Sequence, residues 1–119
     1  MKILVVRGAF LNIFEMQSYV PLKEQVDIRA IGSHRPIHTY VGIPTTRFFS
    51  PYDLGTIGQS IPLWPQMIRA VANRTIGDPH FLLGLERYVR ENGPFDIAHG
   101  AETYYGYDLQ LAKLKKEGM

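Results

Sequence analysis

The sequence predicts an α/β fold in which one open, parallel, Rossmann-like sheet lies between two layers of helices. Short apolar runs rich in branched residues alternate with longer amphipathic segments, a pattern typical of strand–helix–strand units with right-handed crossovers. The 119 residues are 45% hydrophobic, which suffices for the core of one ordinary domain. We therefore expect a single domain over residues 1–119 with strand order 3-2-1-4, incomplete after the fourth strand and the last helix.

Four strands are expected from the apolar runs. The first, Lys2–Val6, is a continuous branched run that suits a central parallel strand covered on both faces. The second, Val26–Ile31, alternates apolar and polar residues and stops at Gly32–Ser33. The third lies within Val41–Phe49, and the fourth is Phe95–His99.

The first two helical regions differ in how clearly they are marked. Asn12 followed by Glu15 has the spacing of a capping box, so we expect a helix from about Ile13 that Pro21 ends or kinks. Prolines and glycines interrupt Ser50–Gly77, and this region is predicted to be a loop followed by one short helix.

The last two helices carry better signals. Asp78 as N-cap and Pro79 at the first position predict a helix that stops at Asn92–Pro94. A final helix over Tyr104–Lys116 has lysines in its last turns, where the helix dipole favours cations, and Gly118 caps it.

Composition excludes several classes of protein. Thirteen basic against eleven acidic residues leave a formal charge of +2, too small a surplus for a nucleic-acid surface, so no nucleic-acid partner is expected. The absence of cysteine excludes disulfides, thiolate metal sites and a cysteine nucleophile. Apolar runs fall short of the ~20 residues of a membrane span and the start is no signal peptide, so we expect a cytoplasmic protein.

Cofactor and metal motifs are also missing. Neither the dinucleotide fingerprint G-x-G-x-x-G nor the P-loop G-x-x-x-x-G-K-[ST] occurs, so no cofactor is expected. His34 and His38 are four residues apart, but Pro36 between them works against a helical face that would bring them together on a metal. We expect no metal site.

Two loops are predicted to form the ligand site. In open parallel sheets, ligands bind outside the carboxyl ends of the strands, at the point where the strand order reverses. Strands one and four flank this point, so the loops Arg7–Asn12 and His99–Thr103 should open into one crevice. His99 can serve several chemical roles there. The alternative that stays open is a buried histidine bonded to the backbone.

Four segments of the sequence resemble segments of a known protein family. They are K-I-L-V-V-R-G-A-F at the start, E-M-Q with P-L-K, V-D-I-R-A-I-G-S, and F-D-I-A-H-G-A-E-T-Y-Y-G-Y. Together they resemble the N-terminal half of group 1 glycosyltransferases of the GT-B fold, along most of the chain. The most specific part is D-I-A-H, because these enzymes commonly carry Asp, two apolar residues and His at the end of this strand. The resemblance implies a catalytic role for His99. It also implies substrate contacts from the two loops, by Arg7, Gly8, Ala9, Asn12, Glu102, Thr103, Tyr104 and Tyr105.

The resemblance implies an enzyme that transfers a sugar from a nucleotide-sugar donor to an acceptor, a sugar or a lipid-linked molecule, bound mainly by this half. Most nucleotide contacts would come from a C-terminal donor domain that these 119 residues do not contain, so the isolated chain is expected to be inactive. The alternative that stays open is a stand-alone, flavodoxin-like module that binds a ligand or a protein without catalysis.

Each residue has a plainer interpretation beside the functional one. Glu102 suits the first turn of a helix, where the dipole stabilises an acid. Tyr104 and Tyr105 suit the packing of the last helix on the sheet, and Arg7 suits a solvated strand end.

Two further partners, a membrane surface and a second copy of the chain, are expected from Trp64 and from the place of the fourth strand in the sheet. Trp64 is a candidate for peripheral contact with the inner face of a membrane, because tryptophan favours interfaces. The fourth strand should lie at the edge of the sheet, where unpaired backbone groups invite a dimer through that edge.

Overall fold

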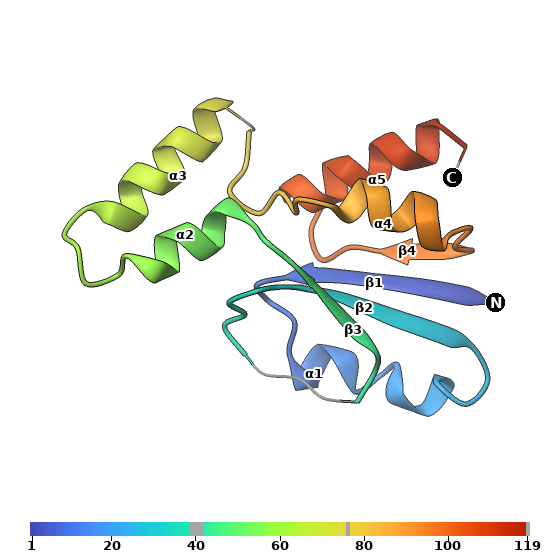
Figure 1. Cartoon of the computed structure of the whole chain (residues 1–119). Coiled ribbons are helices and arrows are strands. Elements are labelled where there is room, and N and C mark those ends of the chain that lie inside the picture. Colours follow the sequence, from blue (N-terminus) through green and yellow to red (C-terminus); the bar gives the residue numbers. More distant parts are fainter. Residues whose placement is uncertain (39–41, 76, 119) are drawn as a thin grey trace.

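The computed structural model describes residues 1–38, 42–75 and 77–118 and confirms the predicted sheet (Figure 1). All pairings are parallel and the order is β3-β2-β1-β4, the predicted 3-2-1-4. The strands are β1 (Lys2–Gly8), β2 (Asp27–Ser33), β3 (Thr45–Phe48) and β4 (Ile97–His99). The first expected strand is therefore longer than predicted and the fourth shorter.

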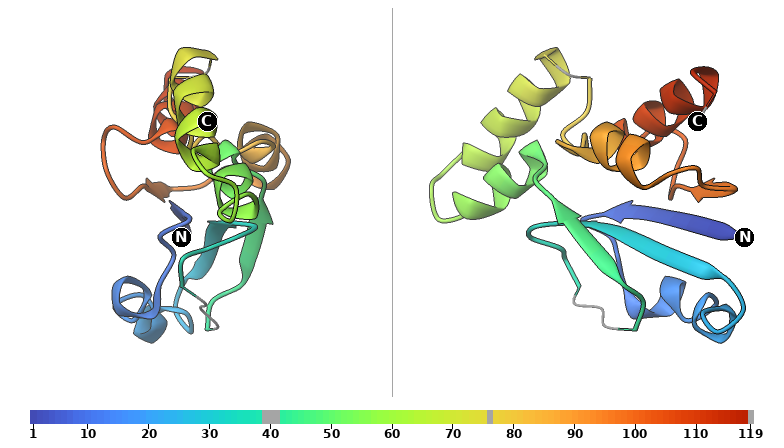
Figure 2. Two further views of the ribbon diagram at one scale, coloured as in Figure 1. Left: turned by 90° about the vertical axis from the view of Figure 1, so that its left-hand side faces the viewer. Right: turned by 45° about the vertical axis from the view of Figure 1, so that its right-hand side comes forward.

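Helices cover both faces of the sheet (Figures 1 and 2). On one face lie α1 (Ile13–Met16) and the 3-10 turn η1 (Val20–Leu22), and on the other lie α4 (Leu85–Asn92) and α5 (Gly106–Lys116). The alternation of β1 divides the core in two, because successive side chains of a strand point to opposite faces. Ile3 and Val5 pack with the α1 side, whereas Leu4 and Val6 pack with α4 and α5.

A hairpin of two helices extends away from the sheet (Figure 1). It consists of α2 (Pro51–Ile57) and α3 (Trp64–Thr75), which we call the α2–α3 arm. The helix predicted after the loop is present as α3, but the expectation that this region holds one helix is wrong, because the segment predicted as a loop contains α2. Helix α2 is stabilised at its start by the Asp53 carboxylate, which accepts from the Ser50 N–H at 2.8 Å. This reciprocal cap uses Asp in place of Glu or Gln, and the nearby breakers hide it in the sequence.

The first helix is shorter than predicted and ends at Met16, well before Pro21. Asn12 does cap it, because its side chain accepts from the Glu15 N–H at 3.0 Å. Met16 is its one buried residue. So little core contact supports no further turns, and Pro21 lies in η1 instead.

The helix predicted from Asp78 begins only at Leu85, after Gly84 with a φ of 98°. Asp78 caps no helix there, because its Oδ1 accepts from the N–H of His80 at 2.7 Å and of Gly106 at 3.2 Å. The other boundaries need smaller corrections. Strand β2 continues through Ser33, α5 starts two residues later than predicted, and Gly118 adopts the left-handed φ of 84° expected after it. Val41, the expected start of the third strand, lies outside the described residues.

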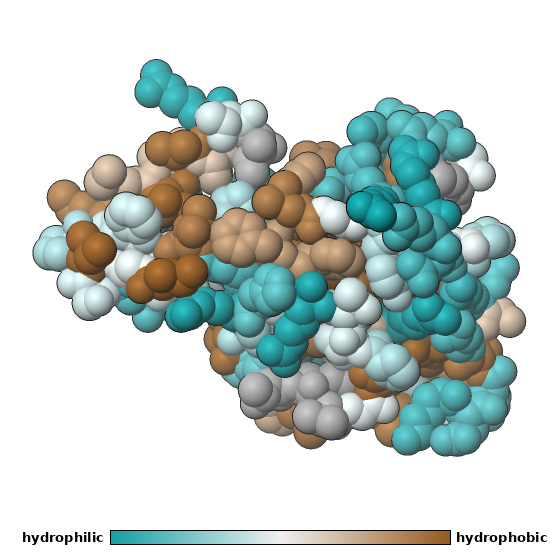
Figure 3. Space-filling model, viewed as in Figure 1, coloured by the Kyte–Doolittle hydropathy of each residue, from teal (hydrophilic) through white to brown (hydrophobic). Residues whose placement is uncertain are grey.

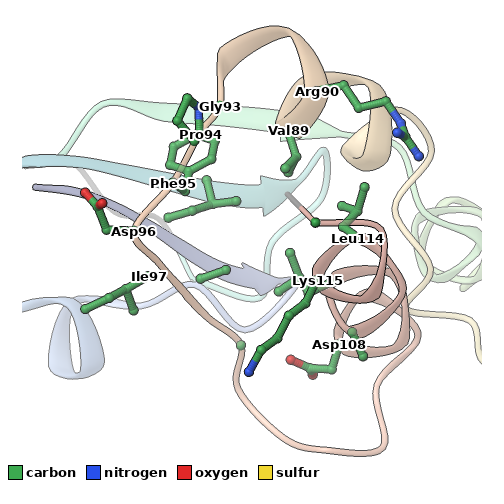
Figure 4. A pocket seen from close by; sticks show the side chains of 16 residues that line it. Val89, Arg90, Gly93, Pro94, Phe95, Asp96, Ile97, Asp108, Leu114 and Lys115 are labelled. Atoms are coloured by element: carbon green, nitrogen blue, oxygen red, sulfur yellow. The ribbon is translucent and has the colours of Figure 1, made fainter.

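A hollow of about 780 Å³, which we call the β4 groove, borders the edge strand between α4 and α5 (Figure 4). Its lining includes Phe95, Ile97, Leu111, Asp108 and Lys115. Strand β4 pairs with β1 alone, and Ile97 is 46% exposed although its register partner in β1 is buried.

Within the described ranges, no helix is long and apolar enough to cross a membrane.

Candidate functional site

The two predicted loops leave the sheet side by side. In the parallel pairing of β1 with β4, Val5 lies opposite His99, where β4 ends, and β1 ends three residues later at Gly8. The site is therefore built from the end of β1, the start of α1, the end of β4 and the start of α5. We call it the switch-point crevice.

His99 is an exposed side chain at the end of β4. Its Nδ1 is hydrogen-bonded to the Tyr19 hydroxyl, and the two rings lie 5.9 Å apart. The buried, backbone-bonded histidine of the alternative is therefore not found. Partial burial lowers the pKa of His99, the Arg7 charge lowers it further, and Glu15 opposes both. The imidazole is thus predominantly neutral at pH 7.

Arg7 lies deeper in the crevice than predicted for a solvated strand end. Its side chain is only 11% exposed, and its Nε lies 3.3 Å from Oε2 of Glu15. The pair brings a guanidinium and a carboxylate close enough to His99 for both charges to act on it.

Asp108, in the first turn of α5, is a site residue that the sequence analysis missed. A Cβ on Gly100 would lie 1.5 Å from Oδ1 of Asp108, so the carboxyl group fills the space that a side chain at position 100 would need. Burial raises the pKa of Asp108 to about 6, against a backbone hydrogen bond from Glu102 and the charge of Arg7. An acid in a first helical turn was the signal that could have found it.

Gly8 makes the turn at the end of β1 and packs against Tyr107. Its φ is 53°, and a Cβ there would lie 3.0 Å from Cε1 of Tyr107. Glycine is therefore needed both for the backbone conformation and for the close contact. Tyr107 is fully buried, and burial raises the pKa of its phenol.

Two polar atoms near this point, Tyr107 Oη and Asp108 Oδ2, are buried without a hydrogen-bond partner among the described residues, whereas the buried Arg7 Nε is ion-paired with Glu15. The Arg7 charge acts on both other groups, lowering the pKa of each against the effect of burial. Leaving a buried polar group unpaired costs on the order of 1–3 kcal/mol. Such groups gathered beside an exposed histidine are suited to receive a polar ligand.

An aromatic cluster adjoins the crevice. Phe10 stacks on Tyr105 at 5.3 Å, and His80 stacks on Tyr52 at 4.9 Å and lies 4.7 Å from Tyr105. Tyr104, 64% exposed, joins at 4.6 Å from Tyr105. Of these rings, only Tyr104 and Tyr105 were predicted as substrate contacts. Phe10 lies in the predicted loop Arg7–Asn12 but was not named, and Tyr52 and His80 come from segments outside both loops.

The remaining predicted residues contribute less. Both polar atoms of the Asn12 amide are used locally, by the Glu15 N–H and the Phe10 carbonyl. Ala9 is buried, and its carbonyl accepts from the Ile37 N–H at 2.8 Å. Glu102 and Thr103 are exposed, and the N-cap of α5 is Tyr105, so Glu102 does not cap this helix.

Metal ligands do not gather in the described part of the chain, where no three His, Cys, Asp or Glu side chains lie close enough to hold an ion. His34 and His38 are both exposed.

The crevice thus combines a neutral imidazole, an ion pair between a largely buried arginine and an exposed glutamate, a carboxyl group of raised pKa and an aromatic surface. Comparisons with protein-family models, with curated proteins and with solved structures found no match for this chain. Any function assigned to the chain therefore rests on the chemistry of this site and on the sequence resemblance.

Proposed function

We propose that this chain is the acceptor-binding half of a cytoplasmic glycosyltransferase that uses a nucleotide-sugar donor. The observation that supports this most is the position of His99, exposed at the open end of β4 beside the Tyr19 ring and within reach of the Arg7 and Glu15 charges. A sugar offers hydroxyls to polar groups and an apolar C–H face to an aromatic ring, and the crevice holds both kinds of partner.

The chemistry assigns distinct roles. Tyr19 engages Nδ1 of His99, which leaves Nε2 to hydrogen-bond the acceptor hydroxyl or a donor oxygen. The Asp108 carboxyl accepts from a second hydroxyl, and the Arg7 guanidinium stabilises negative charge that develops as the nucleotide diphosphate leaves. Catalysis in this proposal comes from preorganised positioning. The resemblance assigns the nucleotide contacts to a donor domain, so the 119 residues alone should transfer no sugar.

Ligand binding can be tested on the chain as it stands. We expect maltose and lactose to cause saturable amide shifts at Gly8, Gly100 and Tyr105 in ¹H–¹⁵N NMR spectra, because these residues surround the crevice. His99→Gln should weaken the binding, whereas Lys116→Gln, exposed at the far end of α5, should not. Shifts confined to another surface, or none at millimolar sugar, would refute the assignment of this crevice.

Catalysis requires a protein that joins this half to a donor-binding domain. There, His99→Ala should lower turnover at least tenfold, which corresponds to about 1.4 kcal/mol of transition-state stabilisation, while the far-ultraviolet circular dichroism stays unchanged. An unchanged rate would make His99 a structural residue, and turnover by the 119 residues alone would refute the division into two domains.

The β4 groove favours a second candidate, a stand-alone module that binds another protein. Its apolar lining and the edge of β4 offer a place for an additional strand, or for a second copy of the chain. Loss of NMR signals along β4 on adding a partner, with the crevice unaffected, would favour this candidate over the first.

A further inference from the structure

The α2–α3 arm presents an apolar surface that the fold leaves uncovered (Figure 3). The side chains concerned are 37% to 68% exposed. They are Leu54, Ile57, Ile61, Leu63, Met67 and Val71. Larger exposed apolar patches on proteins mark interaction sites more often than single exposed residues do.

The exposure follows from the way α3 is turned. Ala72 is buried and Ile68 half-buried, and both lie on the same side of α3. Met67 and Val71, four residues apart, share a neighbouring, exposed side of the helix, and Leu63 immediately precedes α3. Helix α3 therefore turns one apolar side toward the protein and a second one outward.

The tip of the arm is also apolar. It connects α2 to α3 through the uncharged segment Gly58–Leu63, which includes Ile61 and Pro62. Leu63 has a φ of 63°, a left-handed conformation that leucine rarely adopts, and its side chain is 68% exposed. The chain thus holds a large aliphatic group outward at a position where glycine or asparagine would fit the backbone better.

Apart from Asp53 of α2, which is buried, the charges of the arm are positive. No Asp or Glu occurs from Leu54 to Thr75, whereas α3 carries Arg69 and Arg74. A protruding, apolar arm whose exposed charges are positive complements the interface of a lipid bilayer, which carries negative headgroups (Figure 1).

We propose that the α2–α3 arm is a peripheral membrane-contact surface whose tip inserts Ile57, Ile61 and Leu63 into the interfacial region of a bilayer. Trp64, the residue first expected at the membrane, is not the anchor. Its indole N–H donates to the Leu54 carbonyl at 2.7 Å, and its ring covers Gly58, where a Cβ would lie 2.0 Å from Cδ1. Trp64 holds the two helices together, and the aliphatic residues make the contact.

Binding by this surface is weak and reversible. The three tip side chains are only 54% to 68% exposed, so they have less apolar surface left to bury than one myristoyl chain, for which the membrane association constant is about 10⁴ M⁻¹. We expect a smaller constant than this for neutral vesicles, and a larger one when anionic lipid attracts the two arginines.

Vesicle flotation tests the proposal on the intact chain, with vesicles of phosphatidylcholine alone and of phosphatidylcholine with one-fifth phosphatidylglycerol. The double variant Ile61→Ser, Leu63→Asn should lower the association constant at least tenfold in both, since asparagine tolerates the left-handed φ and the fold should persist. The matched control is Phe14→Ser, because Phe14 on α1 is 77% exposed outside the arm. The control should bind like the original chain.

Several results would overturn the proposal. One is no flotation with either vesicle at millimolar lipid, and another is an equal loss of binding in the Phe14 control. Self-association that the double variant abolishes, without any binding to vesicles, would show that a second copy covers the arm. The proposal is independent of the sugar site, so the double variant should leave the NMR response to maltose unchanged.

Discussion

At the scale of single residues, the main feature of the switch-point crevice is that the charges of Arg7 and Glu15 shift the pKa of His99 in opposite directions. His99 and Arg7 were predictable, since they end apolar strands whose neighbours could be inferred. Tyr19, Glu15 and Asp108 were not predicted as site residues, because they come from helices and turns that only the folded chain brings to the same place. Sequence patterns locate strand ends well, but they do not show which side chains face them from other elements.

Arg7 and Glu15 act in opposite directions on the pKa of His99, so removing each charge in turn should shift this pKa in opposite directions. Removing the positive charge by Arg7→Gln should raise the pKa of His99 toward its ordinary value of 6.5, whereas Glu15→Gln should lower it further. The pH dependence of the His99 Cε1 proton in NMR spectra measures both. A shift in the same direction in both variants would contradict this account of the crevice.

Asp108 leads to a prediction about stability. Its pKa rises from 3.8 in the unfolded chain to about 6 in the folded one, so folding favours the protonated form. The burial cost is present above pH 6 and disappears as the pH falls toward 3.8. Asp108→Asn should therefore stabilise the protein at pH 7, by about 1 kcal/mol after allowance for solvent screening.

Urea unfolding at pH 7 and pH 4 measures this effect. The gain from Asp108→Asn should be seen at pH 7 and largely vanish at pH 4, while Glu24→Gln, an exposed change, should stay within about 0.5 kcal/mol of the original at both. Destabilisation at pH 7 would mean that the carboxylate makes favourable contacts in the folded state that outweigh its burial.

At the scale of elements, strands were easier to predict than helices. Branched apolar runs need burial on both faces, and this requirement identified β1 and the strand order correctly. The start of a helix depends on a polar side chain that caps it, and in the folded chain this side chain can instead hydrogen-bond a residue from another element. Asp78 has the sequence of an N-cap, yet its carboxylate serves Gly106, and the helix starts seven residues later. In α2, a cap that uses Asp53 was hidden among helix breakers.

The bridging role of Asp78 is testable. Asp78→Ala removes an acceptor shared by two backbone N–H groups, so we expect a loss of stability of about 1–2 kcal/mol in urea unfolding. Because one of these groups begins α5, amide exchange at Gly106 should accelerate as well. A change confined to residues 78–84 would show that the bond to Gly106 contributes nothing.

At the scale of the whole molecule, the open side of β4 is the main unfinished feature of the sheet. Asp96 donates its N–H to Lys2 of β1, and strand groups alternate in direction, so the backbone of Ile97 and His99 points away from β1. In a monomer, the Ile97 amide should therefore exchange much faster than the Ala98 amide.

Analytical ultracentrifugation across a range of concentrations shows whether a second copy covers this edge. A dimer should slow the exchange of the Ile97 amide as the concentration rises. A strictly monomeric chain whose Ile97 amide already exchanges slowly would mean that the edge is covered within one molecule.

The position of Asp108 couples two surfaces of the molecule, since its carboxyl group borders both the switch-point crevice and the β4 groove. Whatever fills the groove removes water from this carboxyl and favours its protonated form. By thermodynamic reciprocity, protons then strengthen the binding of that partner, so the groove should be occupied more tightly at pH 5 than at pH 7. The same protonation would change Asp108 from an acceptor to a donor for a ligand in the crevice. Occupation of the groove at the sheet edge would thus change the protonation of Asp108, and with it the hydrogen bonding at the ligand site, with no movement of the backbone.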